Sequence, residues 1–226
     1  MTILTNYDLL LFDLDGLLVN TEELHCTAYA EMCAKHQMKF PWDFSRYFQI
    51  AEKGGTEIRD ELYKALSELY KLQPDWAVLY EEKRQALFAL AETSVIPLMP
   101  GVEHLLMQIQ EIPRAMVTHS PRRLVESFAR AQPILNTIPT WFCREDYTHA
   151  KPSPDGFITA IKAFGSPKRV LGFEDAVRGV EALKAAGADA VLVGHPDPKT
   201  RLFWQKQGVI VIDRIDEILL GVKDFH

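Results

Sequence analysis

Two hydrophobic patterns alternate along most of this 226-residue chain. The first is a short continuous apolar run, such as Leu-Leu-Leu-Phe at residues 9–12, which is typical of a strand buried on both faces of a parallel sheet. The second is an amphipathic stretch with helical spacing. Further strands are predicted at residues 115–117, 140–143, 170–173, 190–193 and 209–212, and helices at 122–130, 154–164 and 177–186. This alternation favours an α/β fold with a doubly wound, Rossmann-like parallel sheet.

One part of the chain departs from this alternation. Between residues 21 and 92 the hydrophobic positions recur at helical spacing, and no convincing strand interrupts them. Amphipathic stretches at 22–36, 56–72 and 75–92 predict helices, with breaks at Pro41 and at Gly54-Gly55. We therefore expect an inserted α-helical cap domain over residues 17–96, and a core domain built from 1–16 and 97–226.

The charge balance and the cysteine content limit the function class. Lys and Arg number 25 against 31 Asp and Glu, a formal net charge of −6, whereas duplex nucleic-acid binders usually carry a basic surplus. No signal peptide or membrane-length apolar stretch is evident. The three cysteines, Cys26, Cys33 and Cys143, are too few for a disulfide framework and predict reduced, buried thiols. We expect a cytoplasmic monomer with a small-molecule partner, and neither a nucleic-acid nor a membrane partner.

Polar side chains directly follow several predicted strands. Asp13 and Asp15 come after the first strand, and Thr118, with His119 and Ser120, after the second. Lys151 precedes a helix, and Glu174-Asp175 ends a later strand. Because parallel strands converge at their carboxyl ends, these groups are expected in one cleft.

The chemistry of this cleft follows from its charges. Four carboxylates brought together repel one another at neutral pH unless a cation lies among them. Mg²⁺ fits best, because it takes a few carboxylates and keeps positions for water and phosphate. Lys151 and the Thr118 hydroxyl would then face a phosphoryl group. Helix capping explains each motif separately, but it does not explain why Lys151 and Thr118 should reach the same edge.

Taken in order, these motifs resemble those of the haloacid dehalogenase superfamily. The residues concerned are Phe12-Asp13-Leu14-Asp15-Gly16 with Thr21-Glu22, Val117-Thr118, Lys151-Pro152-Ser153-Pro154-Asp155 and Gly172-Phe173-Glu174-Asp175. The chain is most similar to the branch of β-phosphoglucomutase and phosphoglycolate phosphatase, and the resemblance covers nearly the whole chain, including the helical insertion.

The resemblance implies a role for each matching residue. Asp13 matches the nucleophile that forms an aspartyl-phosphate, and Asp15 matches the general acid/base. Asp13, the backbone carbonyl of Asp15 and Asp175 match the Mg²⁺ ligands, with Glu174 beside them. Thr118 and Lys151 match the residues that hold the phosphoryl oxygens, with His119 and Ser120 as neighbouring substrate-binding candidates.

Three functions remain open at this stage. The first is a Mg²⁺-dependent phosphatase acting on a small phosphorylated metabolite of the sugar phosphate or phosphoglycolate type. The second is a sugar phosphomutase of the β-phosphoglucomutase type, and the third is a non-catalytic regulatory module. Hydrolase is favoured over mutase, because Glu57 stands where the mutase has a phosphate-binding cap arginine. The regulatory module ranks last, since every essential carboxylate and the lysine are present.

Within the predicted cap, two residues are candidates for substrate binding. His25 aligns with a histidine near the hinge of sugar-phosphate members, although a satisfied helix histidine is an equal interpretation. Lys53 is interpreted as a substrate-facing or solvated cation. The aromatic stretch Trp42, Phe44, Tyr47 and Phe48 is more typical of packing than of a substrate pocket.

Overall fold

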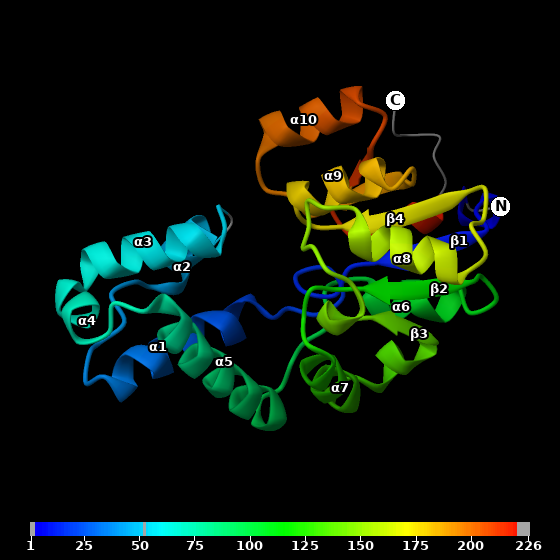
Figure 1. Cartoon of the computed structure of the whole chain (residues 1–226). Coiled ribbons are helices and arrows are strands. Elements are labelled where there is room, and N and C mark those ends of the chain that lie inside the picture. The colour runs from blue at the N-terminus through cyan, green and yellow to red at the C-terminus, as the bar shows by residue number, and fades with distance from the viewer. Residues whose placement is uncertain (1–2, 52, 221–226) are drawn as a thin grey trace. The chain divides into compact units, whose positions relative to one another are not determined.

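The computed structural model describes residues 3–51 and 53–220. The chain forms two compact units: Met1–Asn20 together with Ile96–His226, and Thr21–Val95. We call the first the core unit and the second the cap unit, and each is described by itself (Figure 1). Within the described residues no helix combines the length and apolar character that a membrane span requires.

The core unit is built on a six-stranded sheet in which every neighbouring pair is parallel. The strand order is β3-β2-β1-β4-β5-β6. The strands are β1 Leu9–Phe12, β2 Arg114–Val117, β3 Thr140–Phe142, β4 Val170–Glu174, β5 Asp189–Val193 and β6 Ile210–Ile212. Every residue of β1, β2 and β4 is buried, which confirms the prediction from continuous apolar runs.

Helices cover both faces of this sheet (Figure 1). They are α6 Val102–Gln108, α7 Arg122–Ala131, α8 Asp155–Ala163, α9 Val177–Ala185 and α10 Pro198–Lys206. Side chains of α8, α9 and α10 share one buried cluster with Leu9 and Leu11 of β1. Strands β2 and β3 are added on one side of β1, and strands β4 to β6 on the other side. Because the connections between parallel strands are right-handed, α8–α10 lie on the face of the sheet opposite to α6 and α7. The predicted doubly wound α/β fold is confirmed.

Short 3₁₀ helices complete the described part of the core unit. They are η1 Ile3–Asn6, η2 Pro133–Thr137, η3 Arg144–Asp146 and η4 Ile215–Leu220. Of these, η3 follows β3 directly and brings its side chains to the carboxyl edge of the sheet.

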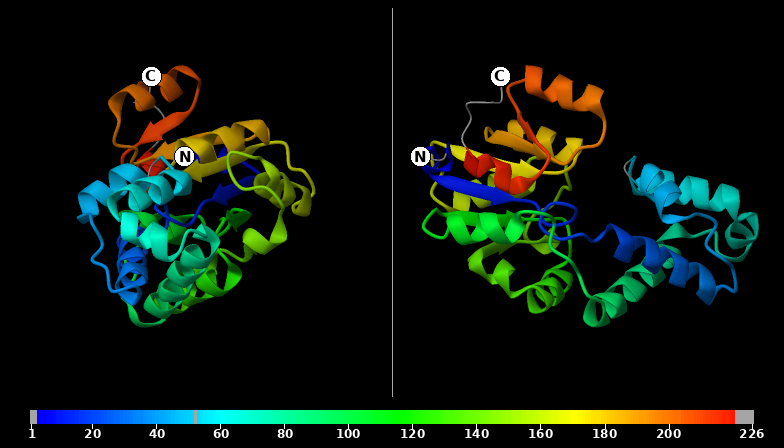
Figure 2. Two further views of the ribbon diagram at one scale, coloured as in Figure 1. Left: turned by 60° about the vertical axis from the view of Figure 1, so that its left-hand side comes forward. Right: turned by 180° about the vertical axis from the view of Figure 1, so that it is seen from behind.

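The cap unit consists of helices, and the two further views in Figure 2 show no strand among its described residues. The helices are α1 Glu22–Lys35, α2 Phe44–Ala51, α3 Gly55–Ala65, α4 Ser67–Leu72 and α5 Trp76–Thr93. Their core is aromatic: the rings of Phe40 and Trp42 meet edge to face at 5.2 Å, and Tyr47 is 2% exposed. Packing is thus confirmed for Trp42 and Tyr47, whereas Phe44 is 41% exposed.

The structure adds detail that the hydrophobic pattern did not give. The helix expected over residues 56–72 is two helices, because Leu66 leaves the helical conformation at φ −122° and ψ 70°. Leu62 and Leu69 are both fully buried. The helical spacing of hydrophobic residues therefore continues across the break, and the sequence pattern does not show where the first helix ends. Helices α2, α6 and α10 were not anticipated. The start of α10 does carry a signal, since Asp197 caps it and Pro198 occupies its first turn.

The cysteines are all free. Cys33 and Cys143 are buried, as expected of small hydrophobic side chains, while Cys26 is half-buried. Burial raises the pKa of the Cys33 and Cys143 thiols, to about 11 and about 12. Neither is therefore a reactive thiolate at neutral pH.

Candidate active site

A group of carboxylates lies at the carboxyl ends of β1 and β4, the two strands at which the order of strand addition changes direction. Asp13 directly follows β1, and Glu174 and Asp175 stand at the end of β4, the strand paired with β1. The Asp13 N–H donates to the Phe173 carbonyl at 3.1 Å, and Phe12 stacks on Phe173 at 4.8 Å. Strand pairing thus sets the carboxylates side by side, at the position where open α/β sheets bind ligands.

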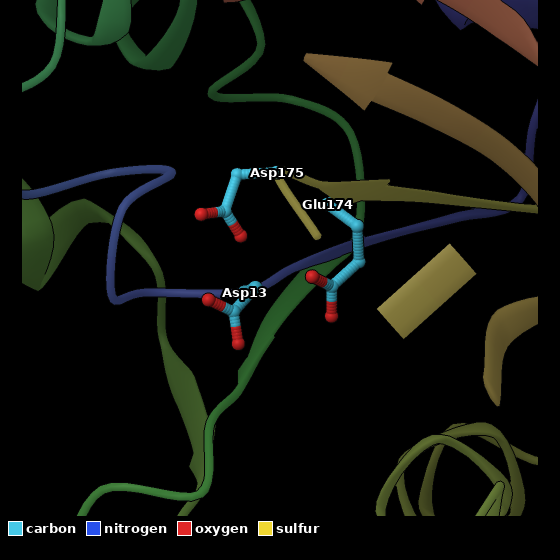
Figure 3. A group of neighbouring side chains, drawn as sticks. All are labelled: Asp13, Glu174 and Asp175. Atoms are coloured by element: carbon cyan, nitrogen blue, oxygen red, sulfur yellow. The ribbon is translucent and has the colours of Figure 1, made fainter. Parts of the chain in front are cut away.

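The three carboxylates converge closely enough to share one cation. An oxygen atom from each of Asp13, Glu174 and Asp175 lies within 4.8 Å of the other two (Figure 3). Burial and the charge of neighbouring carboxylates raise the pKa of all three, that of Glu174 to about 7. The donor set contains only oxygen, so its chemistry fits a hard divalent cation such as Mg²⁺.

Lys151 supplies the positive charge within this group. Its Nζ contacts Asp13 Oδ1, lies 2.5 Å from Glu174 Oε1 and donates to the Val117 carbonyl at 3.0 Å. Burial by itself lowers the pKa of Lys151, but the charges of Asp13 and Glu174 outweigh it and the net pKa is raised. One ammonium does not balance three carboxylates, which leaves charge for a divalent cation to neutralise.

Asp15 is held by hydroxyl groups from the neighbouring strand end. Thr118 Oγ1 and Ser120 Oγ donate to Asp15 Oδ2 at 3.1 and 2.7 Å. The Ser120 N–H in turn donates to Thr118 Oγ1 at 3.0 Å. The second polar set predicted from the sequence therefore meets the first, and it orients the Asp15 carboxylate two residues after Asp13.

Two glycines leave space for the carboxylates. A Cβ on Gly16, whose φ is +79°, would overlap Asp175 Oδ2, and a Cβ on Gly179 would overlap the Glu174 carboxyl group. The role of Gly179 was missed from the sequence. Its signal was a glycine in a helix near Glu174-Asp175, where no turn requires one.

Tyr147 is a further site neighbour that sequence reasoning missed. Its hydroxyl donates to the Thr118 carbonyl at 2.9 Å and lies 3.4 Å from His119 Nδ1. Burial raises the pKa of Tyr147 to about 12, so it remains a neutral donor. Tyr147 lies in a loop without a motif, and no pattern in the sequence singles it out.

The remaining candidates lie in different surroundings. His119 follows Thr118 at the site edge and is exposed. Lys53 is exposed within the cap unit. His25, also in the cap unit, has its Nδ1 2.7 Å from Nζ of Lys83, and burial together with that charge lowers its pKa well below the ordinary value.

Arg122, two residues after Ser120, is held by a carboxylate of η3. Its guanidinium pairs with Asp146 at 2.6 Å.

Comparisons with known proteins agree with this arrangement. A family model described as haloacid dehalogenase-like hydrolase matches residues 7–187. The (DL)-glycerol-3-phosphatase 2 of Arabidopsis thaliana is 29% identical over 95% of this chain and 87% of its own. The fructose-1-phosphate phosphatase YqaB of Escherichia coli is 30% identical over 80% of this chain and 94% of its own.

Among solved structures, CbbY from Rhodobacter sphaeroides superimposes in two forms. Its complex with phosphate gives a TM-score of 0.69 at 25% identity, covering 91% of this chain and 93% of CbbY. A mutant in complex with xylulose-(1,5)-bisphosphate gives 0.65 at 26% identity, covering 83% and 86%.

Proposed function

Since the chain belongs to the haloacid dehalogenase-like hydrolase family, we propose that it is a Mg²⁺-dependent phosphatase acting on a small phosphorylated metabolite. The observation that carries this proposal is the convergence of Asp13, Glu174, Asp175 and Lys151 at the carboxyl ends of β1 and β4. Asp15 lies beside them, held by Thr118 and Ser120. A nucleophile, an acid/base and an electrostatic clamp thus share one strand edge.

Asp13 is the proposed nucleophile. Its carboxylate oxygen attacks phosphorus in line, and the bond to the leaving alcohol breaks as the aspartyl-phosphate forms. Asp15 gives a proton to that alcohol, then takes one from the water that hydrolyses the aspartyl-phosphate. The two hydroxyls on Asp15 Oδ2 hold its carboxylate in position for both transfers.

The remaining site residues would bind the phosphoryl oxygens and the metal ion. Lys151 and Thr118 would bind the phosphoryl oxygens, and Lys151 also offsets the negative charge of Asp13 and Glu174. Asp13, Asp175 and the backbone carbonyl of Asp15 would hold Mg²⁺, with Glu174 beside them. When bound, the metal supplies Lewis-acid stabilisation of the phosphoryl group.

Phosphate release is favoured over isomerisation. Mutase chemistry needs a cap cation for the second phosphate, and Glu57 occupies the expected position. The neighbouring Arg59 pairs with Asp60 at 2.7 Å. The relatives named for glycerol 3-phosphate and fructose 1-phosphate support a substrate in the class of small polyol and sugar phosphates.

The test is phosphate release from a panel of small esters, with Mg²⁺ and with a chelator. The panel includes fructose 1-phosphate, glycerol 3-phosphate, phosphoglycolate and β-glucose 1-phosphate, and isomer products are monitored together with phosphate. We expect metal-dependent release from at least one ester. Isomerisation that depends on a bisphosphate, without release, would replace the phosphatase by a mutase.

A further inference from the structure

A tyrosine hydroxyl from outside the sheet reaches the backbone at the end of β2. Tyr147, in the loop between η3 and α8, donates through its hydroxyl to the Thr118 carbonyl at 2.9 Å. Thr118 directly follows β2, and within residues 3–51 and 53–220 no backbone N–H donates to its carbonyl. The hydroxyl therefore satisfies a backbone acceptor that sheet pairing leaves open.

The Tyr147 ring is held in place as well as its hydroxyl. A Cβ on Gly156, the second residue of α8, would lie 3.0 Å from Cε1 and Cζ of Tyr147 and from Cγ1 of Val117. The ring therefore packs directly on the backbone of α8, where the glycine leaves room for it. Lys151 lies in the same loop, and its Nζ donates to the Val117 carbonyl at 3.0 Å. Two side chains thus fasten this loop to the consecutive carbonyls of Val117 and Thr118.

Thr118 connects this fixed backbone to Asp15. Its Oγ1 accepts from the Ser120 N–H at 3.0 Å and donates to Asp15 Oδ2 at 3.1 Å. Ser120 Oγ donates to the same carboxylate oxygen at 2.7 Å. A shift of the Thr118 backbone would therefore move both hydroxyl groups relative to Asp15.

The two hydroxyl groups decide which oxygen of Asp15 can carry a proton. A carboxyl oxygen that accepts two hydrogen bonds has no lone pair left for a proton of its own. Oδ2 accepts from both hydroxyls, so the acid form of Asp15 carries its proton on Oδ1. In the proposed reaction this proton passes to the alcohol oxygen as its bond to phosphorus breaks, and the phosphoryl group passes to Asp13.

We propose that Tyr147 is a positioning residue for the general acid: its hydroxyl fixes the Thr118 backbone, which keeps the proton of Asp15 on Oδ1. A displacement of about 1 Å near a reacting group can lower a rate by about 10²-fold, so the loss of one such hydrogen bond should be measurable. This inference rests on the proposed phosphatase function and adds a residue to its proton transfer.

Tyr147→Phe tests this role, because phenylalanine keeps the ring and its packing and removes only the hydroxyl. Tyr63→Phe is the matched control, since the Tyr63 hydroxyl also donates to a backbone carbonyl, that of Gln73 in the cap unit, at 2.9 Å. Ser120→Ala removes a hydroxyl that contacts Asp15 directly. It shows the effect expected of a misplaced acid proton.

The readout is the dependence on the leaving group. Fructose 1-phosphate and glycerol 3-phosphate lose an alkoxide, which needs the proton of a general acid, whereas p-nitrophenyl phosphate loses a phenolate that is stable at neutral pH. Single-turnover release of the alcohol or phenol measures this step before the aspartyl-phosphate is hydrolysed. A variant that merely loosened the fold would lower the rate constants for both kinds of ester alike.

We expect Tyr147→Phe to lower the rate constant for alcohol release by about tenfold, a part of the roughly 10²–10⁴-fold that a general acid contributes. The rate constant for p-nitrophenol release, which gains little from an acid, should change by less than about twofold. Ser120→Ala should show the same selectivity, and Tyr63→Phe should match wild type with both kinds of ester.

The outcomes separate this inference from the proposed function. Equal losses with both kinds of ester in Tyr147→Phe or in Ser120→Ala, or no loss in Tyr147→Phe, would overturn the positioning role while phosphatase activity stands. If wild type releases no alcohol from any ester of the panel, the proposed function fails, and crystal structures of wild type and Tyr147→Phe then test the inference alone. Loss of the hydroxyl contacts at Asp15 Oδ2 in the variant would support the positioning role, and unchanged contacts would overturn it.

Discussion

The core and cap units use their interiors differently. The core unit places buried charge at one edge of an aliphatic sheet: Glu174 is 1% exposed and Asp13 7%. The cap unit is filled with stacked and tilted rings, and Lys83 is the charged side chain that its described residues bury, with Nζ 4.9 Å from the Tyr29 ring centre. Buried charge is thus concentrated at the proposed site of phosphoryl transfer, whereas the interior of the cap unit consists mainly of packed aromatic rings.

This contrast has an energetic meaning. Buried carboxylates cost free energy unless a cation offsets them. Lys151 offsets part of the charge of Asp13 and Glu174, and the proposed Mg²⁺ would offset the rest. The aromatic interior of the cap unit contributes stability without such a cost. Substitutions at the site edge should therefore change activity far more than substitutions elsewhere.

The largest effect is expected from Asp13→Asn. Asparagine keeps the shape but is not a nucleophile, so kcat should fall by about 10³-fold or more, in the range seen when a catalytic nucleophile is removed. Circular dichroism should remain that of the wild type. The measurement is steady-state phosphate release with the best substrate of the panel.

Asp8→Asn is the matched control for that substitution. Asp8 is exposed and precedes β1, the strand that Asp13 follows. Its removal should leave kcat unchanged. Retained turnover in Asp13→Asn would exclude Asp13 as the nucleophile.

Lys151→Met should cost the core unit about 3–5 kcal/mol of unfolding free energy, the usual loss when one partner of a buried ion pair is removed. Asp13 and Glu174 would then face each other without their ammonium. Urea unfolding measures the loss, and added Mg²⁺ should restore part of it.

Lys162→Met, on the exposed side of α8, is the control and should change stability little. If both lysine variants unfold at the same urea concentration, the ion pairs of Lys151 do not stabilise the core unit.

A smaller effect is expected from Gly16→Ala. The new Cβ would overlap Asp175 Oδ2, and alanine is strained at φ +79° by about 1–2 kcal/mol. Displacing Asp175 should raise the Mg²⁺ concentration needed for half-maximal activity.

Gly187→Ala is the control that separates the effect of backbone strain from the effect of the contact with Asp175. Gly187 has a similar φ of +81°, with nothing within 4 Å of its Cβ position. Both variants should lose stability through backbone strain, but the Mg²⁺ requirement should rise only in Gly16→Ala. A rise in both would show that backbone strain, and not the contact with Asp175, controls the site.

The core unit was largely predictable because its signals are local. An apolar run and the polar residue that ends it are neighbours in sequence, so Asp13, Thr118 and Glu174 could be placed at strand ends, and the structure brings them together. Tyr147 and Gly179 could not be found this way, because their roles depend on contacts across the fold.

The cap unit shows the limit of the same reasoning. Helical spacing located its helices but not the break at Leu66. The pairing of His25 with Lys83 joins residues 58 positions apart, which no spacing rule reveals. The substrate-binding roles of His25 and Lys53 remain predictions.

The smallest effect is expected from Glu82→Gln in the cap unit. Burial raises the pKa of Glu82, but hydrogen bonds from Lys35 at 2.7 Å and His36 at 2.6 Å outweigh it, and the net pKa is lowered. The folded state therefore favours the carboxylate. This stabilisation is complete above pH of about 4.3, the ordinary pKa of glutamate, and is lost as the pH falls through the lowered value.

Glu82→Gln should thus cost about 0.5–1 kcal/mol at pH 7, because these partners are partly exposed, and the difference from wild type should shrink in acid. Thermal unfolding at pH 7 and at about pH 3, below the ordinary pKa of glutamate, measures both. Glu81→Gln is the control, since Glu81 pairs with Arg84 at the surface. A cost for Glu82→Gln that does not change with pH would mean that Glu82 stabilises the cap unit through packing and not through its charge.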